Sequence, residues 1–219
     1  MKSNAELQKD VQDAIKWEPL LNAAEIGVTI KDGVVTLTGS VDSYSNKTEA
    51  EDAAKNVAGV KAVVEKIEVK YSSTWAKKDD NEIAVEIVNA LKWNWRIPND
   101  KVKVRVENGW VTLEGELQWN YQKEAARDAV RDLLGVTGVS NNITIKSESR
   151  DLVETRAIES ALRRSWAVGG EDIVVRELDH KVTLTGTVKS WYQKDEAARI
   201  AWNAPGVWTV DNELVIEYA

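Results

Sequence analysis

Hydrophobic positions repeat one order of elements three times along the 219-residue chain. Each copy first spaces its apolar residues at three- and four-residue intervals, as an amphipathic helix does, and then alternates them as half-buried strands do. A second helical stripe and a last strand follow. The first stripe of the first copy is Leu7, Val11, Ala14 and Ile15. We therefore expect helix, strand, strand, helix and strand in every copy.

A tight turn separates the first two predicted strands of each copy. Asp32-Gly33 and Asn108-Gly109 are strong hairpin signals, because glycine adopts positive φ freely. The third copy has Asp179-His180 at this position, and histidine tolerates positive φ better than most residues. If His180 only fills a turn, replacing it with glycine should keep or raise stability.

Glycines recur in fixed columns of the repeat. Gly39, Gly115 and Gly186 fall inside the second predicted strand, where a glycine marks a bulge or a close approach of backbone. The helix that follows is lined with alanine, so we expect this helix to cross the sheet where the glycine leaves room. In the first copy this helix should end at Gly59, acting as a left-handed C-cap.

The order of elements also predicts the topology of each sheet. The first two strands form an antiparallel hairpin, while the second helix should join the second and third strands as a parallel, right-handed crossover. The fold class is therefore α+β, with three tandem αββαβ domains. Each has a three-stranded mixed sheet and two helices packed on one face. The expected domains are residues 1–70, 80–146 and 152–219, with linkers at 71–79 and 147–151.

Short motifs inside the copies match a known family. The second strand reads Val35-Thr-Leu-Thr-Gly39, Val111-Thr-Leu-Glu-Gly115 and Val182-Thr-Leu-Thr-Gly186. Gly-Val follows the second helix in every copy, and Asn141-Asn142 or Asp211-Asn212 precedes the last strand, where the first copy has Glu65-Lys66. Over nearly its whole length the chain resembles three tandem BON domains. The resemblance implies a non-enzymatic protein of the bacterial envelope or stress response that binds phospholipid or envelope surfaces.

Charge and composition narrow the possible partners. The net charge is −7, with about −4 over residues 5–70, 0 over 81–146 and −3 over 152–217. No copy is basic, which argues against nucleic-acid binding through phosphate neutralisation. There is no cysteine, and no apolar run follows Lys2 as it would in a signal peptide. Localisation stays open: the resemblance implies the periplasm, whereas Met1 as the native start would imply the cytoplasm.

The sequence offers no constellation for catalysis. His180 is the single histidine and has neither a second histidine nor a cysteine as partner, so serine catalysis lacks its base. No phosphate-binding glycine loop occurs, and the carboxylate pairs fall on expected exposed faces. We expect no enzyme activity, no catalytic residue, no metal, no cofactor and no small-molecule substrate.

Aromatic residues between the second strand and the second helix are the candidate binding residues. They are Tyr44 in the first copy, Trp119 and Tyr121 in the second, and Trp191 and Tyr192 in the third, with the aligned lysines Lys47, Lys123 and Lys194. Aromatic rings beside a cation at a helix N-terminus suit a lipid headgroup. The alternative, which we favour, is that the rings pack as staples against their own helix or sheet. If lipid binding occurs, the second and third copies should carry it.

A second tryptophan cluster ends the first helix of the copies, at Trp17, Trp93, Trp95 and Trp166. Packing in the core or between repeats is the interpretation we favour, and an exposed partner site is the alternative. The function predicted is a non-enzymatic tandem binding protein for anionic phospholipid or envelope proteins. The alternative function is a cytoplasmic structural or protein-interaction module with no lipid role. The oligomeric state is not predicted.

Overall fold

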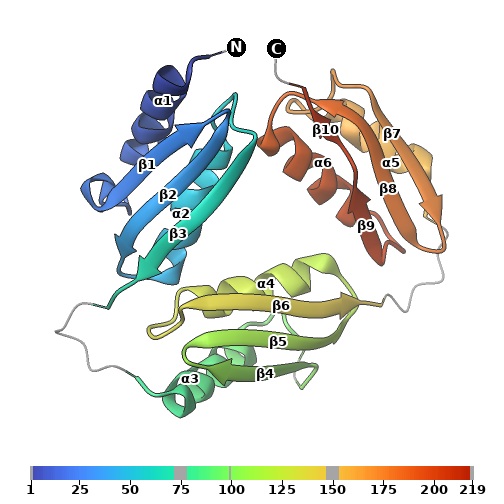
Figure 1. Ribbon diagram of the computed structural model, residues 1–219. Helices are drawn as coiled ribbons and strands as arrows, with labels where there is room; N and C mark the ends of the chain where they lie inside the picture. Colours follow the sequence, from blue (N-terminus) through green and yellow to red (C-terminus); the bar gives the residue numbers. More distant parts are fainter. Residues whose placement is uncertain (1, 72–77, 99, 147–152, 218–219) are drawn as a thin grey trace. The chain divides into compact units, whose positions relative to one another are not determined.

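The computed structural model describes residues 2–71, 78–98, 100–146 and 153–217. Within these ranges the chain forms three separate sheets, each with its own two α-helices (Figure 1). This confirms the α+β class and the order of elements expected in each repeat. The expected linkers lie largely outside the described residues, so the domain boundaries stay predictions.

The elements follow the same order in each repeat. The first repeat contains α1 (Asn4–Trp17), the short 3-10 helix η1 (Ala23–Glu25), β1 (Ile26–Lys31), β2 (Val34–Val41), α2 (Tyr44–Lys55) and β3 (Ala62–Val69). The second contains α3 (Asp80–Trp93), β4 (Val102–Glu107), β5 (Trp110–Leu117), α4 (Asn120–Arg131) and β6 (Gly138–Ile145). The third contains α5 (Thr155–Arg164), β7 (Ile173–Leu178), β8 (Lys181–Val188), α6 (Trp191–Trp202), β9 (Thr209–Asn212) and β10 (Val215–Ile216).

Local sequence explains where the first helices begin. Ser3 with Glu6 forms a capping box for α1, and Asp79 with Glu82 forms one for α3, so that backbone N–H groups at each helix start are satisfied. In the third repeat the N-cap is Glu154, which aligns with Leu7 and Ile83 and makes no side-chain cap hydrogen bond, and α5 has 10 residues where α1 has 14. α5 therefore starts about one turn later in its repeat than α1 and α3.

The strand pairing in each repeat is that of a mixed sheet. β1 pairs with β2, β4 with β5, and β7 with β8 in antiparallel fashion, while β3 lies parallel to β2. In the third repeat the last strand is divided into β9 and β10, which lie parallel to successive parts of β8. β9 and β10 pair with β8 in the same register, with Thr209 opposite Lys181 and Val215 opposite Thr187.

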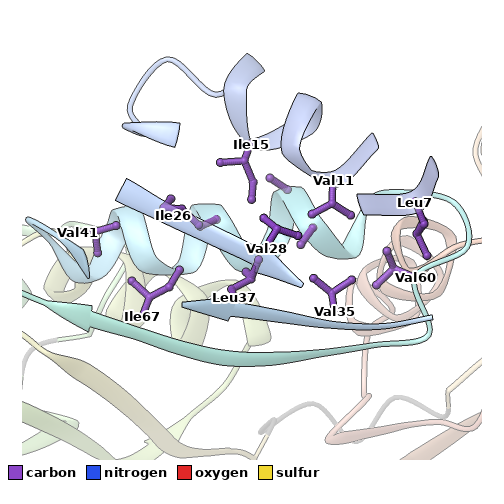
Figure 2. Close-up of a cluster of buried hydrophobic side chains, with 13 residues drawn as sticks. Leu7, Val11, Ile15, Ile26, Val28, Val35, Leu37, Val41, Val60 and Ile67 are labelled. Atoms are coloured by element: carbon purple, nitrogen blue, oxygen red, sulfur yellow. The ribbon is translucent and has the colours of Figure 1, made fainter. Parts of the chain in front are cut away.

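The core of each repeat lies between its sheet and its two helices. In the first repeat, side chains from α1 meet those of β1 and β2 (Figure 2), and the alanines of α2 complete the cluster. The buried members are aliphatic throughout: Leu7, Val11, Ile15, Ile26, Val28, Val35, Leu37, Val41, Ala50, Ala53, Ala54, Val60 and Ile67. The alanine lining therefore lets α2 approach the sheet, as the sequence pattern indicates.

The glycine column of the second strand marks a close approach of backbone, which is one of the two causes expected for it. A Cβ atom on Gly39, Gly115 or Gly186 would overlap the backbone carbonyl oxygen of the residue before the first strand, which is Glu25, Lys101 or Asp172. The three glycines also have φ of 121°, 148° and 127°, a conformation that side chains strongly disfavour. The expectation that the glycine makes room for the crossing helix is wrong, because the close neighbour is backbone of the adjacent strand.

Gly59 is not the C-cap of the second helix. α2 ends at Lys55, and Asn56 is its C-cap, in the right-handed conformation. Gly59 lies in the following turn with φ of 105°. The glycine thus reverses the chain toward β3 rather than terminating the helix.

His180 lies in the turn between β7 and β8 with φ of 64°, so its expected turn position is confirmed. Its Nδ1 is 2.8 Å from the carbonyl oxygen of Gly206, and its ring stacks on Trp208 with centroids 4.2 Å apart. Because a carbonyl oxygen only accepts, Nδ1 carries the hydrogen in this contact. The side chain thus fastens the turn to the segment that leads into β9.

Gly115→Ala should destabilise the protein nearly as much as Gly115→Val, by about 3 kcal/mol, because a single Cβ already meets the carbonyl oxygen of Lys101. Unfolding in urea measures the loss of stability of each variant relative to wild type. Gly170→Val is the matched control, since nothing lies within 4 Å of a Cβ at Gly170. A well-tolerated alanine combined with a damaging valine would restore the helix-crossing explanation.

His180→Gly should lower stability by about 1 kcal/mol. Glycine relieves the positive φ, but the variant loses one hydrogen bond and one aromatic stack, each typically contributing about 0.5–1.5 kcal/mol. The contacts therefore reverse the sign expected from the turn alone. The measurement is thermal unfolding of the wild type and the variant. A melting temperature of the variant equal to or above that of the wild type would show that the two contacts contribute little to stability.

Candidate functional site

The aromatic residues after the second strand lie at the start of the second helix. Tyr44 opens α2 and Trp191 opens α6, each directly after an N-cap serine. The Oγ of Ser43 accepts from the backbone N–H of Asn46 at 3.1 Å, and Ser190 caps α6 in the same way. These caps satisfy N–H groups that an anion would otherwise use, which weakens the case for an anion site at both helix starts.

The second repeat arranges its aromatic residues differently. Trp119 precedes α4 and aligns with the capping serines of the other repeats, 76 and 71 residues away, whereas Tyr121 aligns with Tyr192. The Oε1 of the buried Gln122 accepts from the backbone N–H groups of Gln118 and Trp119, both at 3.1 Å. The aromatic pairs of the two repeats are therefore not equivalent, although the sequence analysis treats them as counterparts. Tyr121 is about half exposed and Trp119 is partly buried.

Lys47 and Lys194, two of the three aligned lysines, bond to the last strand of their own repeat. The Nζ of Lys47 donates to the carbonyl oxygen of Ile67 at 2.9 Å and pairs with Glu65 at 2.9 Å. The Nζ of Lys194 donates to the carbonyl oxygen of Leu214 at 2.7 Å. Two of the three lysines thus join the second helix to the last strand, which gives their column a structural role.

The asparagine of the last-strand motif belongs to the same arrangement. Asn212 donates from Nδ2 to the carbonyl oxygen of Lys194 at 2.7 Å, and its Oδ1 accepts from the backbone N–H of Leu214 at 3.3 Å. In the second repeat Asn141 likewise accepts from the backbone N–H of Ile143. The motif thus links the second helix to an edge strand that has a sheet neighbour on only one side.

The tryptophans at the end of the first helix are the most exposed large side chains among the described residues. Trp17, Trp93, Trp95 and Trp166 expose 83%, 84%, 87% and 88% of their surface. The expectation that they pack in the core is wrong, because leucine, isoleucine and valine already fill the inward positions of these helices. Trp17 aligns with Trp93, and Trp95 with Trp166, so only the second repeat carries both positions.

The second repeat also presents apolar side chains on the outer face of α3. Val85 and Val88 expose 61% and 54% of their surface, on the side away from the buried Ile83, Ile87 and Leu91. The aligned residues are Lys9 and Gln12 in the first repeat, and Arg156 and Glu159 in the third. This surface was missed by the sequence analysis, although comparing the three outer faces position by position would have found it.

Cations and a pocket accompany this apolar surface. The guanidinium of Arg96 lies over the Trp95 ring, 5.6 Å from its centroid, and Lys92 is in the last turn of α3. A pocket beside the helix end has Val88, Leu91, Lys92 and Ile97 in its lining. Exposed valines along α3 and exposed tryptophans with basic residues at and after its end thus belong to one stretch of the chain. We call Val85, Val88, Lys92, Trp93, Trp95 and Arg96 the α3 surface.

The chain matches the BON domain family three times, over residues 3–71, 79–147 and 151–218. The chain belongs to the BON domain family. It is also 30% identical over 144 residues to the osmotically-inducible protein Y of Escherichia coli strain K12, across 62% of this chain and 72% of that protein. The resemblance noted in the sequence is confirmed, and each BON repeat contains the αββαβ order described above.

Solved structures are only remotely similar to the chain. A structure of CdsD, a structural protein of the type III secretion system of Chlamydia trachomatis, is 18% identical, with a TM-score of 0.26 over 98% of this chain and 93% of that one. The periplasmic domain of PrgH is 9% identical, with a TM-score of 0.22 over 88% and 95%. At these TM-scores the likenesses carry no conclusion about function.

The described ranges of the BON repeats contain neither a candidate metal-binding cluster nor a candidate membrane-spanning helix. No group of three or more histidine, cysteine, aspartate or glutamate residues is placed there to hold a metal ion. None of the helices in those ranges is long and apolar enough to cross a membrane.

Lys194→Met should lower the free energy of unfolding by about 1 kcal/mol, because it removes the donor to the carbonyl oxygen of Leu214. Its binding to lipid vesicles should not change. Lys70→Met is the control, since Lys70 and its ion-pair partner Glu68 are 65% and 71% exposed, and such a surface pair has little energetic weight. Unchanged stability together with weakened vesicle binding would instead assign the lysine to a headgroup.

Proposed function

We propose that this BON-domain protein is a non-enzymatic binding protein of the stress response or the cell envelope that attaches to anionic phospholipid surfaces, chiefly through its second repeat. The exposure of Trp93 and Trp95 at the end of α3 is the observation that carries the proposal. The relationship to an osmotically inducible protein supports the association with stress.

The physical argument rests on what tryptophan does at an interface. Its ring is apolar while its N–H needs a polar partner, so it favours the boundary between headgroups and acyl chains. Val85 and Val88 extend the apolar area along α3, and Lys92 and Arg96 supply the positive charge that anionic lipids attract. A single exposed tryptophan needs no explanation, but two beside exposed valines and cations form a patch.

Charge favours the second repeat over its neighbours. It has nine acidic and nine basic side chains over residues 81–146, whereas the other two repeats are net negative. An anionic membrane repels net negative repeats, and the repulsion falls off over about 8 Å at physiological ionic strength. With Asp80 included the second repeat is still the least negative of the three, so it approaches the surface at the lowest electrostatic cost.

The aromatic loops are a second proposed contact. Trp119 and Tyr121 belong to the same repeat as the α3 surface, and Trp191 and Tyr192 are the residues of the third repeat. Lys47 and Lys194 are not proposed to bind lipid headgroups, because their ammonium groups already donate to backbone carbonyl oxygens. Simultaneous engagement of two repeats would raise the overall affinity through effective concentration.

The test is co-sedimentation of the full chain with vesicles of phosphatidylcholine alone or mixed equally with phosphatidylglycerol. Trp93→Ala/Trp95→Ala should lower binding to the mixed vesicles about tenfold or more, because burying even half of two tryptophan side chains contributes more than the 1.4 kcal/mol that a tenfold change represents. Circular dichroism verifies folding, which these exposed positions should not disturb.

The matched control is Trp17→Ala/Trp166→Ala, which removes two equally exposed tryptophans from the negatively charged repeats and should leave most of the binding intact. Trp119→Ala and Trp191→Ala measure the loop contribution separately. Equal losses in both double variants would contradict the assignment to the second repeat. If the wild-type protein does not bind anionic vesicles, the alternative function, a structural or protein-interaction module, is favoured.

A further inference from the structure

The last strand of each repeat is an edge strand, with one long side free of any sheet neighbour. β3 and β6 are the outermost strands of their sheets, and β9 with β10 takes the same place beside β8 (Figure 1). Such an edge presents a row of backbone N–H and C=O groups to which a strand of another chain can add. The way these groups are satisfied therefore bears on whether the protein self-associates.

Leu214, between β9 and β10, turns its backbone groups to this free side. The N–H of Glu213 donates to the carbonyl oxygen of Leu184 in β8 at 2.9 Å. The N–H of Glu217, four residues later, likewise donates to the carbonyl oxygen of Val188 at 2.8 Å. Backbone groups of successive residues in an extended strand alternate in direction, so those of Leu214 point away from β8. Its side chain is 1% exposed and belongs to the core.

Two side chains bond to both outward groups of Leu214. The Nζ of Lys194 donates to its carbonyl oxygen at 2.7 Å, and the Oδ1 of Asn212 accepts from its N–H at 3.3 Å. Asn212 is itself held by its Nδ2, which donates to the carbonyl oxygen of Lys194 at 2.7 Å. The hydrogen-bonding capacity of the edge at this residue is thus used within the repeat.

The first repeat makes the same two bonds with a different residue. The Nζ of Lys47 donates to the carbonyl oxygen of Ile67, which aligns with Leu214, at 2.9 Å. The Oε1 of Glu65 accepts from the N–H of Ile67, and its other oxygen pairs with Lys47 at 2.9 Å. Asn141 makes the corresponding bond to an N–H of the second repeat at 3.4 Å. An oxygen bonded to the same outward N–H is therefore common to the three repeats, although the residue that supplies it differs.

We propose that these side chains keep the last strand from pairing with a second copy of the chain. An incoming strand would need the outward N–H and C=O groups of Leu214 or Ile67 as partners, and both groups are already bonded. It would also have to displace the ammonium group of Lys194 or Lys47, or bury that charge against its own backbone, which is costly. Lysine at a sheet edge opposes edge-to-edge association for this reason. The lysine column thus closes the edge as well as joining helix to strand.

The test is the oligomeric state of the full chain, measured by sedimentation velocity over a range of protein concentrations. Lys194→Met/Asn212→Val removes both bonds to Leu214 and should raise the association constant about tenfold or more over wild type, because the released groups can bond to a second copy. Lys47→Met/Glu65→Val makes the same change in the first repeat and should have the same effect. Circular dichroism verifies that both variants are folded.

Two controls separate the opening of the edge from a loss of stability. Ile158→Val removes one methylene from the core of the third repeat, which lowers stability but leaves the edge bonds in place. Asn212→Glu gives the third repeat the residue that the first repeat uses. Both variants should associate no more than wild type, whereas the milder Asn212→Val alone should lie between wild type and the double variant.

Two results would overturn the proposal. The first is that both double variants, when folded, associate no more than wild type. The second is that Ile158→Val or Asn212→Glu associates as strongly as the double variants, because association would then follow from lost stability or from any change at the edge rather than from the two bonds.

Discussion

In each repeat the backbone of the first strand comes so close to the second that only glycine fits between them. Gly39, Gly115 and Gly186 lie opposite the first residue of the neighbouring strand and would collide with the preceding carbonyl oxygen if they carried a side chain. This contact fixes the register of the hairpin. Register decides which residues face inward, because a slip of one residue turns every side chain of a strand to the opposite face. The inward set that fills the core depends on it.

Much of the fold could be predicted because its signals are local and occur three times. The apolar stripes, the turns and the Val-Thr-Leu-x-Gly strand gave the right elements in the right order. The contacts between residues of different elements could not be predicted from the sequence. The neighbour of the glycines is a carbonyl oxygen rather than a helix, and the partner of Lys194 is a carbonyl oxygen 20 residues away. Such contacts depend on how strands and helices are brought together, which no periodicity shows.

The aromatic residues of the candidate site also could be placed only in part from the sequence. The fully buried side chains in the cores of the first and third repeats are aliphatic, and Trp202 packs against the third core while only partly buried. The sequence favours packing of Trp93 and Trp95 in the core or between repeats, because three marginal units need contacts to hold together, yet both side chains are exposed. The decisive fact is that the inward positions of α3 were already filled by isoleucine and leucine. The α3 surface, which combines exposed apolar side chains with Lys92 and Arg96, is therefore the proposed lipid contact.

The central claim is that the α3 surface is the part of the chain that meets an anionic membrane. Fluorine NMR of protein labelled with 5-fluorotryptophan tests it directly, with signals assigned by single Trp→Phe variants and vesicles containing phosphatidylglycerol and a paramagnetic lipid. We expect the signals of Trp93 and Trp95 to broaden first, while those of Trp17 and Trp166 stay sharp. Broadening confined to Trp119 and Trp191, or equal broadening of every signal, would contradict the assignment.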